Sequence, residues 1–162
     1  MAVAAGLVAF ALCTDTAGSG RVPAAFNGLI GMKPTKGRWS TTGLVPACRS
    51  LDCITVFSHT IADAELVDSL VAGIDPADSF SRPVQDRAAA PRRLGVPRAD
   101  QRKFLGDAAA RSLFDRSLDA FAKGGAEFVE IDLAPLKEAA LLLYGGPWVA
   151  ERYAAIRSFI EG

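Results

Sequence analysis

The chain has 162 residues, of which 50% are hydrophobic, so it is one domain's worth of sequence and can bury a sizeable core. Its 18 basic and 18 acidic residues cancel, and the net charge therefore offers no electrostatic footprint for nucleic acid or for an anionic membrane. No apolar run reaches the roughly 18 residues that a membrane span needs, and residues 1–6 lack the basic segment of a secretory signal peptide.

The N-terminal residues are predicted to form two short strands with a helix between them. Residues 2–6 are expected to be the end of a helix, and the apolar run within residues 7–13 predicts a buried strand. A short helix is expected over residues 22–26, because the Asn27-Gly28 pair that follows it is typical of a helix C-terminus. Residues 29–32 are again apolar and predict the second strand.

Between the first strand and the helix, residues 14–21 form a turn of small residues around one serine. Pro23 suits the first turn of the following helix, so the order of strand, tight turn and helix start lifts the Ser19 hydroxyl out of the backbone. Ala17 and Gly18 have small side chains, which leaves main-chain N–H groups beside the serine able to face a substrate oxygen. This arrangement is typical of a nucleophile with its own oxyanion hole.

Spacing alone leaves other interpretations of this turn open. A turn rich in Gly, Ser and Thr often has only a structural role, because short motifs give many false positives. A phosphate-binding loop is disfavoured, since no Gly-Lys-Ser/Thr sequence closes the segment. The G-x-S-x-G elbow of many hydrolases is also disfavoured, because it needs a glycine where Ala17 stands.

The next segment is predicted to be a loop followed by a strand and a helix. Residues 35–48 are rich in Gly, Thr and Ser and predict a loop with Trp39 as its one large anchor. Residues 54–58 are β-branched and aromatic and predict a strand. Thr60 and Asp63 have the spacing of a capping box at the start of a helix. The apolar stripe of that helix is expected to consist of Leu66, Val67, Leu70 and Val71.

The second half of the chain has the alternation of strands and helices that is typical of the α/β class. Residues 75–93 are polar, contain proline and show no periodicity, so they predict an exposed surface connection. The elements expected after it are strand 94–96, helix 107–123, strand 128–133 and helices 135–143 and 147–159, the last two separated by Tyr144-Gly145-Gly146.

Two neighbouring stretches together resemble the signature of the amidase signature hydrolases. They are Thr14-Asp15-Thr16-Ala17-Gly18-Ser19-Gly20-Arg21 with Pro23-Ala24, and Gly28-Leu29-Ile30-Gly31-Met32-Lys33-Pro34-Thr35-Lys36-Gly37-Arg38. Within this family, the continuation is most similar to allophanate hydrolases, in the residues Gly43-Leu44-Val45-Pro46-Ala47-Cys48-Arg49-Ser50-Leu51-Asp52-Cys53. Other amidases usually have a Gly-Pro pair shortly after the Ser-x-Asp, where this sequence has Ile54-Thr55-Val56-Phe57.

The resemblance implies a mixed β-sheet core covered by helices, and it implies roles for the turn residues. Ser19 takes the position of the acylated serine, and Thr16, Ala17 and Gly18 take the positions whose backbone N–H groups form the oxyanion hole. In the family, the base is a second serine after a Gly/Ser-rich loop, itself deprotonated through an upstream lysine. Neither segment is present here, so we expect residues 1–162 to be a partial amidase domain and this fragment to be inactive by itself.

Five further residues need an assignment. Asp15 and Arg21 flank the loop, and we assign them to bracing it by a buried ion pair or by hydrogen bonds to the turn backbone; a solvated surface pair is the alternative. Lys33 lies downstream of the turn, whereas the catalytic lysine of the family lies upstream, so Lys33 is expected to be structural. His59 is expected to be a packing or helix-start residue. Cys13 replaces a glycine that the family generally has, which is tolerated where φ is negative.

A second pair of candidate residues lies near the C-terminus. Tyr144 and Arg152 flank a Gly-Gly-Pro turn, and the stretch between them resembles an allophanate hydrolase segment that lines the substrate pocket. Allophanate is small and planar and has a carboxylate, to which a guanidinium can donate two parallel hydrogen bonds. The alternative is an arginine on a helix surface with a tyrosine that covers the core.

The resemblance therefore predicts hydrolysis of a C–N amide bond of allophanate through a seryl acyl-enzyme, with release of ammonia. The alternatives are an amidase of other specificity and a non-catalytic truncated product. The family needs no metal or organic cofactor for this step, and its usual functional partner is a biotin-dependent urea carboxylase; homodimers are common in it. The three cysteines are odd in number and lack C-x-x-C spacing, so we expect free thiols in a cytoplasmic protein.

Overall fold

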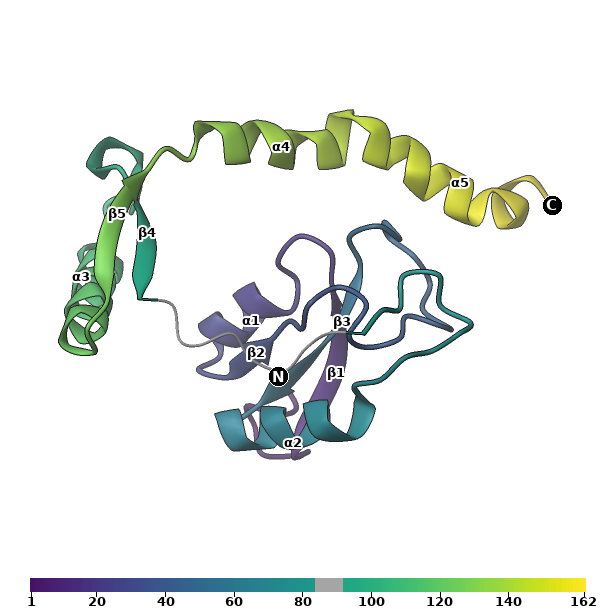
Figure 1. The fold of residues 1–162 in the computed structure, drawn as a ribbon, viewed down its shortest axis with the longest axis horizontal. Helices are drawn as coiled ribbons and strands as arrows, with labels where there is room; N and C mark the ends of the chain where they lie inside the picture. Colours follow the sequence, from purple (N-terminus) through teal and green to yellow (C-terminus); the bar gives the residue numbers. More distant parts are fainter. Residues whose placement is uncertain (84–91) are drawn as a thin grey trace. The chain divides into compact units, whose positions relative to one another are not determined.

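The computed structural model describes residues 1–83 and 92–162 of the chain. They belong to two compact units, one formed by Met1–Gln85 with Gly146–Gly162 and the other by Asp86–Gly145. Helices and strands are mixed in the chain, which confirms the α/β class predicted from the sequence (Figure 1). Within the described ranges, no helix combines the length and the apolar character that crossing a membrane requires.

The first unit contains a three-stranded antiparallel sheet in the order β1-β3-β2 (Figure 1). Strand β3 (Cys53–Ser58) lies in the centre, and its β-branched and aromatic residues confirm the strand predicted over 54–58. Strand β2 (Ile30–Met32) confirms the second apolar run as a strand. Strand β1 (Phe10–Asp15) pairs with β3 so that its last residue, Asp15, lies opposite Cys53.

The prediction of a buried strand over residues 7–13 is wrong in two respects. Residues 7–9 are bends, so the strand starts at Phe10. The residues before them, 2–6, form a hydrogen-bonded turn, so the separate prediction of a helix end there is also wrong. Strand β1 is also an edge strand with a neighbour on one side only. Its apolar side chains Phe10 and Leu12 are also open to solvent, at 47% and 54% exposed, as is Leu7 before the strand at 77%. Periodicity identifies a strand but does not show what covers its faces.

Two helices pack near this sheet, and both begin where the sequence predicts. Helix α1 (Arg21–Phe26) follows the serine turn and has Asn27 as its C-cap residue. Helix α2 (Ile61–Val71) starts with the predicted capping box, in which the Thr60 hydroxyl accepts from the Asp63 N–H. Helix α2 packs on β3 and β2. The buried apolar cluster below it consists of Trp39, Val56, Ala64 and Val67.

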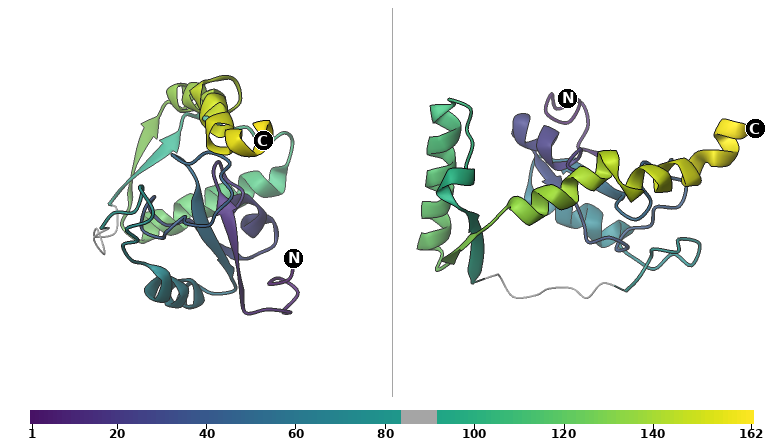
Figure 2. Two further views of the ribbon diagram at one scale, coloured as in Figure 1. Left: turned by 90° about the vertical axis from the view of Figure 1, so that its right-hand side faces the viewer. Right: turned by 90° about the horizontal axis from the view of Figure 1, so that it is seen from above.

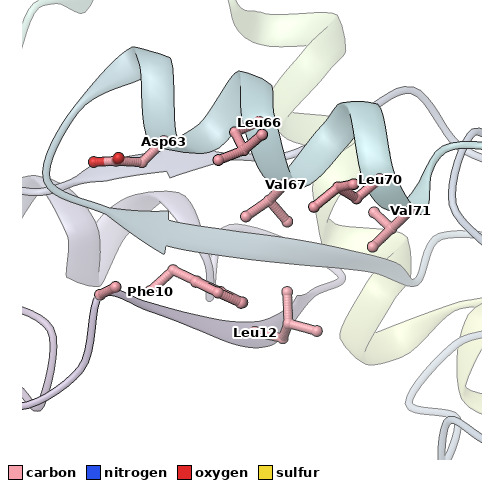
Figure 3. Close-up of a pocket in the computed structure, with 8 residues that line it drawn as sticks. Phe10, Leu12, Asp63, Leu66, Val67, Leu70 and Val71 are labelled. Atoms are coloured by element: carbon pink, nitrogen blue, oxygen red, sulfur yellow. The ribbon is translucent and has the colours of Figure 1, made fainter.

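Most of the predicted apolar stripe of α2 does not enter this cluster. Val67 is buried, but Leu66 is 60% and Leu70 76% exposed. Figure 3 shows the α2 side chains facing Phe10 and Leu12 of β1 across an apolar groove of about 350 Å³. The four predicted residues thus share one face of α2, but only Val67 of them is buried.

The loops of the first unit are held by carboxylates. Asp68 on α2 accepts from Nε and Nη2 of Arg38 and, at 2.7 Å, from the indole of Trp39, which is the predicted loop anchor. Residues 75–83 are mostly exposed, as predicted for a surface connection, although Asp78 is buried and accepts from the N–H and hydroxyl of Thr41. The remainder of the predicted connection includes residues 84–91, which lie outside the described residues. Helix α5 (Pro147–Glu161) also belongs to this unit.

The second unit contains a parallel pair of strands, β4 (Arg93–Pro97) and β5 (Glu127–Ile131), in which Arg93 lies opposite Glu127. Helix α3 (Ala108–Lys123) connects them after the short helix η1 (Ala99–Gln101), as can be followed in Figures 1 and 2. Helix α4 (Ala134–Gly145) follows β5. The predicted elements are confirmed, with α4 extending through Tyr144 so that the break before α5 is Gly146 alone.

Candidate active site

The serine turn connects the end of β1 to the start of α1, as the order of elements in the sequence predicts. Ser19 is exposed at the turn, while Gly20 beside it is buried. Gly18 has a φ of +151°, in the region that favours glycine, and its carbonyl accepts from the N–H groups of Arg21 at 3.0 Å and Val22 at 2.8 Å. The turn is therefore closed by the first turn of α1, with the serine side chain outside it.

Backbone donors beside Ser19 are unpaired. Across the described residues, the N–H groups of Ala17, Gly18 and Ser19 donate to no protein acceptor, and the Ser19 hydroxyl makes no hydrogen bond. An oxyanion hole requires donors that are fixed in place and not used by the protein itself. Ala17 and Gly18 are two of the three positions predicted from the sequence to supply such donors, and their N–H groups are not used by the described residues.

The carboxylate of Asp15 fixes the base of the turn. It is completely buried, and it accepts from Arg21 at 2.9 Å (Nε) and 3.1 Å (Nη2) and from Lys33 Nζ at 3.2 Å. It also accepts from the backbone N–H groups of Gly20 and Arg21, each at 3.2 Å. Burial by itself would raise the pKa of Asp15, but the hydrogen bonds and charges of Arg21 and Lys33 outweigh it and hold the pKa far below its ordinary value. Asp15 is thus ionised, and its carboxylate accepts hydrogen bonds from five donors.

Two contacts at Thr16 involve residues that sequence reasoning did not place in the site. The Thr16 hydroxyl donates to Oδ1 of Asp52, and the Thr16 carbonyl accepts from Lys33 Nζ at 3.4 Å. Asp52 is 2% exposed, and its Oδ2 accepts from the N–H groups of Ala47 and Cys48, each at 2.9 Å. The sequence signal for Asp52 was its place directly before β3, but its proximity to Thr16 follows from the pairing of β3 with β1.

Cys13 and His59 lie in the same unit without contacting the serine turn. Cys13 is not among the described residues with positive φ. Its backbone therefore tolerates a side chain in place of the glycine of the family. Its thiol lies 2.7 Å from the Thr55 hydroxyl, and burial raises its pKa. His59 contacts the carbonyl of Val3 at 2.7 Å through Nε2, which therefore has the proton. This contact agrees with a packing role for the histidine.

The second candidate pair is divided between the two units. Arg152 lies on α5, in the first unit, and its Nε donates to the Ala47 carbonyl at 2.8 Å. Tyr144 lies in the last turn of α4, in the second unit, and is 76% exposed. Glu151, beside Arg152, accepts from the N–H and the hydroxyl of Ser50, each at 2.7 Å. Sequence reasoning missed Glu151, since its partner lies 101 residues away.

No group of three or more His, Cys, Asp or Glu side chains is arranged to bind a metal ion in residues 1–83 and 92–162. The serine turn itself supplies a hydroxyl, unpaired backbone donors and a buried network of charges around them. This combination suits nucleophilic attack on a carbonyl carbon.

Comparison with known proteins gives consistent matches along the whole chain. The family model described as Amidase matches residues 1–161. The urea amidolyase of Saccharomyces cerevisiae is 46% identical over 162 residues, which cover 98% of this chain and 9% of the yeast protein. The indoleacetamide hydrolase of Pseudomonas savastanoi is 37% identical over 137 residues, which cover 85% of this chain and 28% of that protein.

A solved structure of the Kluyveromyces lactis allophanate hydrolase is similar to this chain, with a TM-score of 0.89 and 40% identity. The match covers 99% of this chain and 26% of the K. lactis chain. The chain thus spans about a quarter of that protein and 9% of the length of the yeast urea amidolyase.

Proposed function

The chain belongs to the amidase family, and on this premise we propose that it supplies the nucleophile turn of an allophanate hydrolase. The observation that supports this most directly is the Ser19 hydroxyl, which is exposed and unpaired beside free backbone donors at Ala17 and Gly18. The likeness to the yeast urea amidolyase and to the K. lactis allophanate hydrolase supports the choice of substrate.

In the proposed reaction, Ser19 Oγ attacks the terminal amide carbonyl of allophanate. The backbone N–H groups of Thr16, Ala17 and Gly18 stabilise the oxyanion, and each such donor is typically worth about 3 kcal/mol in the transition state. The C–N bond then breaks, ammonia leaves with the proton taken from the serine, and water hydrolyses the resulting acyl-enzyme.

Ser19 needs a base, because a free hydroxyl is a weak nucleophile. The 18 residues before it contain neither serine nor lysine. We therefore propose that the second serine and the lysine of the amidase mechanism come from outside these 162 residues, so that this polypeptide by itself does not turn over. In this proposal the chain is a partial amidase domain.

We assign recognition of the substrate carboxylate to Arg152, and the assignment of Tyr144 to substrate binding stays a prediction from the resemblance alone. Arg152 uses its Nε to bond the Ala47 carbonyl, and within the described part of the chain neither of its terminal nitrogens has an acceptor. These two nitrogens can donate to the two oxygens of one carboxylate.

The likeness to an indoleacetamide hydrolase supports a second candidate, an amidase for uncharged amides. The two candidates differ at Arg152, because an uncharged amide offers no carboxylate to its guanidinium. For allophanate hydrolysis we further propose a functional link to a urea carboxylase, which the resemblance to allophanate hydrolases implies. A cytoplasmic location is proposed from the free thiols of Cys13, Cys48 and Cys53.

The test is ammonia release from allophanate by the complete protein, with Ser19→Ala and Arg152→Ala variants. Ser69→Ala, on the exposed face of α2, is the matched serine control. We expect Ser19→Ala to abolish activity and Ser69→Ala to retain it. Arg152→Ala should raise KM for allophanate but not for an uncharged amide. Activity that survives Ser19→Ala would contradict the proposal, and a complete protein inactive on every amide would favour a non-catalytic product.

A further inference from the structure

The side chain of Thr16 is held by a buried carboxylate that belongs to another loop. Asp52 Oδ1 accepts from the Thr16 hydroxyl, and Asp52 itself is fixed through Oδ2 by the Ala47 and Cys48 N–H groups at 2.9 Å. Its own N–H donates to the Cys48 carbonyl at 2.8 Å, which closes a turn. An acceptor held by three other bonds is a rigid attachment point for the hydroxyl.

This attachment bears directly on the orientation of a backbone donor. The Thr16 carbonyl accepts from Lys33 Nζ at 3.4 Å, while the Thr16 side chain is tied to Asp52. The peptide unit between Thr16 and Ala17 is planar and trans, so fixing its carbonyl directs the Ala17 N–H to the opposite side. That N–H is one of the unpaired donors beside Ser19.

Residues 47–52, here called the bridging segment, also form hydrogen bonds with α5. Glu151 accepts from the N–H and hydroxyl of Ser50 at 2.7 Å, and Arg152 Nε donates to the Ala47 carbonyl at 2.8 Å. The backbone hydrogen bond from Ser50 is the main reason that the pKa of Glu151 is lowered, so its carboxylate is ionised when it makes these bonds. The bridging segment therefore touches both the serine turn and the helix of Arg152.

We propose that Asp52 is a positioning residue for the oxyanion donors of the serine turn, and that Glu151 couples this turn to α5 through the bridging segment. This inference rests on the proposed function of Ser19 and Arg152. It assigns to Asp52 and Glu151 an effect on the chemical step that is separate from binding of the substrate carboxylate.

The experiment compares Asp52→Asn, Thr16→Val and the double variant in the complete protein, with kcat and KM measured on allophanate and on an uncharged amide. We expect each single variant to lower kcat about tenfold or more on both substrates, with KM changed by less than about threefold. Thr16→Val removes this hydrogen bond and Asp52→Asn removes its charged acceptor, so both act on one contact and the double variant should be within about twofold of the worse single variant.

Asp78→Asn is the matched control. Asp78 is also buried and accepts from a threonine hydroxyl and two backbone N–H groups, those of Thr41 and Phe80, but it has no contact with the serine turn. Its substitution should lower Tm about as much as Asp52→Asn and leave kcat unchanged. Glu151→Ala should lower kcat on the uncharged amide, which has no carboxylate for Arg152.

Several outcomes would overturn the inference while leaving the proposed function intact. One is a wild-type kcat in Asp52→Asn in a protein that Ser19→Ala inactivates. Another is a loss of kcat in Asp78→Asn equal to that in Asp52→Asn, which would indicate general destabilisation. A fold loss of kcat in the double variant equal to the product of the two single losses would show that Asp52 and Thr16 act independently. Activity that survives Ser19→Ala removes the proposed function and this inference together.

Discussion

Replacing Asp15 by Asn removes the charge around which the serine turn is built. In the wild type, Oδ2 accepts from the Gly20 N–H, the Arg21 N–H and Arg21 Nε, while Oδ1 accepts from Arg21 Nη2 and Lys33 Nζ. An Asn in its better orientation keeps the three bonds at the first oxygen and places an NH₂ group against two cationic donors. Two charge-assisted hydrogen bonds are thereby lost, each worth about 1.5–3 kcal/mol.

The expected loss of unfolding free energy lies at the lower end of that sum, because one of the two cationic side chains can be solvated again after the substitution. The Arg21 side chain is 52% exposed and that of Lys33 21%, whereas Asp15 is fully buried. Loss of one partner from a buried pair typically costs about 3–5 kcal/mol, and the half-exposed guanidinium reduces the expected destabilisation to about 3 kcal/mol. The turn should loosen as well, so ammonia release through Ser19 should fall together with stability.

The assay is urea unfolding of the complete protein at pH 7, with free energies obtained by linear extrapolation. Asp78→Asn provides the comparison, because it is buried to a similar degree but bonded mainly to neutral donors, and it should cost about 1–2 kcal/mol. If Asp15→Asn destabilises the protein no more than Asp78→Asn does, the ion-pair network does not hold the turn and the reasoning is refuted.

Two further predictions concern acid and backbone strain. Because the pKa of Asp15 is lower in the folded than in the unfolded protein, its contribution to stability is complete above pH about 4 and is lost as the pH falls further. The difference in unfolding free energy between wild type and Asp15→Asn should therefore shrink by up to about 1.4 kcal/mol per pH unit below pH 4. A difference that grows in acid would contradict this. Gly18→Ala places a methyl group 3.3 Å from Val22 Cγ2 at a φ of +151°, so kcat should fall about tenfold or more. Gly28→Ala, at a φ of +64° in open space, should cost about 1 kcal/mol of stability and retain kcat in the same assay.

The sequence was sufficient for the features that depend on local chemistry. The capping box at Thr60 and Asp63, the helix end at Asn27 and the strand over 54–58 are confirmed, because each depends on residues within one turn or one strand. The amidase resemblance is confirmed as well, since a long signature specifies the family without any knowledge of contacts. The roles of Ser19 and of the proposed oxyanion donors remain predictions.

Contacts between distant segments could not be predicted in this way. Asp52 reaches Thr16, and Glu151 reaches Ser50, only because strand pairing and the position of α5 bring them together. The same limit explains the apolar run before the turn, whose periodicity is correct for a strand although Leu12 is exposed. Which face of an edge strand is covered depends on neighbours that a periodic pattern does not specify.

Three buried carboxylates in the first unit stabilise different loops by the same pattern of hydrogen bonds. Asp15, Asp52 and Asp78 each accept from two backbone N–H groups and from at least one side chain. The buried apolar cluster is small, and of its members only Trp39 comes from a loop, so it holds few loop positions directly. Directional bonds to carboxylates can do so, because each oxygen accepts several donors. All three aspartates should therefore contribute to stability, whereas only Asp15 and Asp52, which contact the serine turn, should also control kcat.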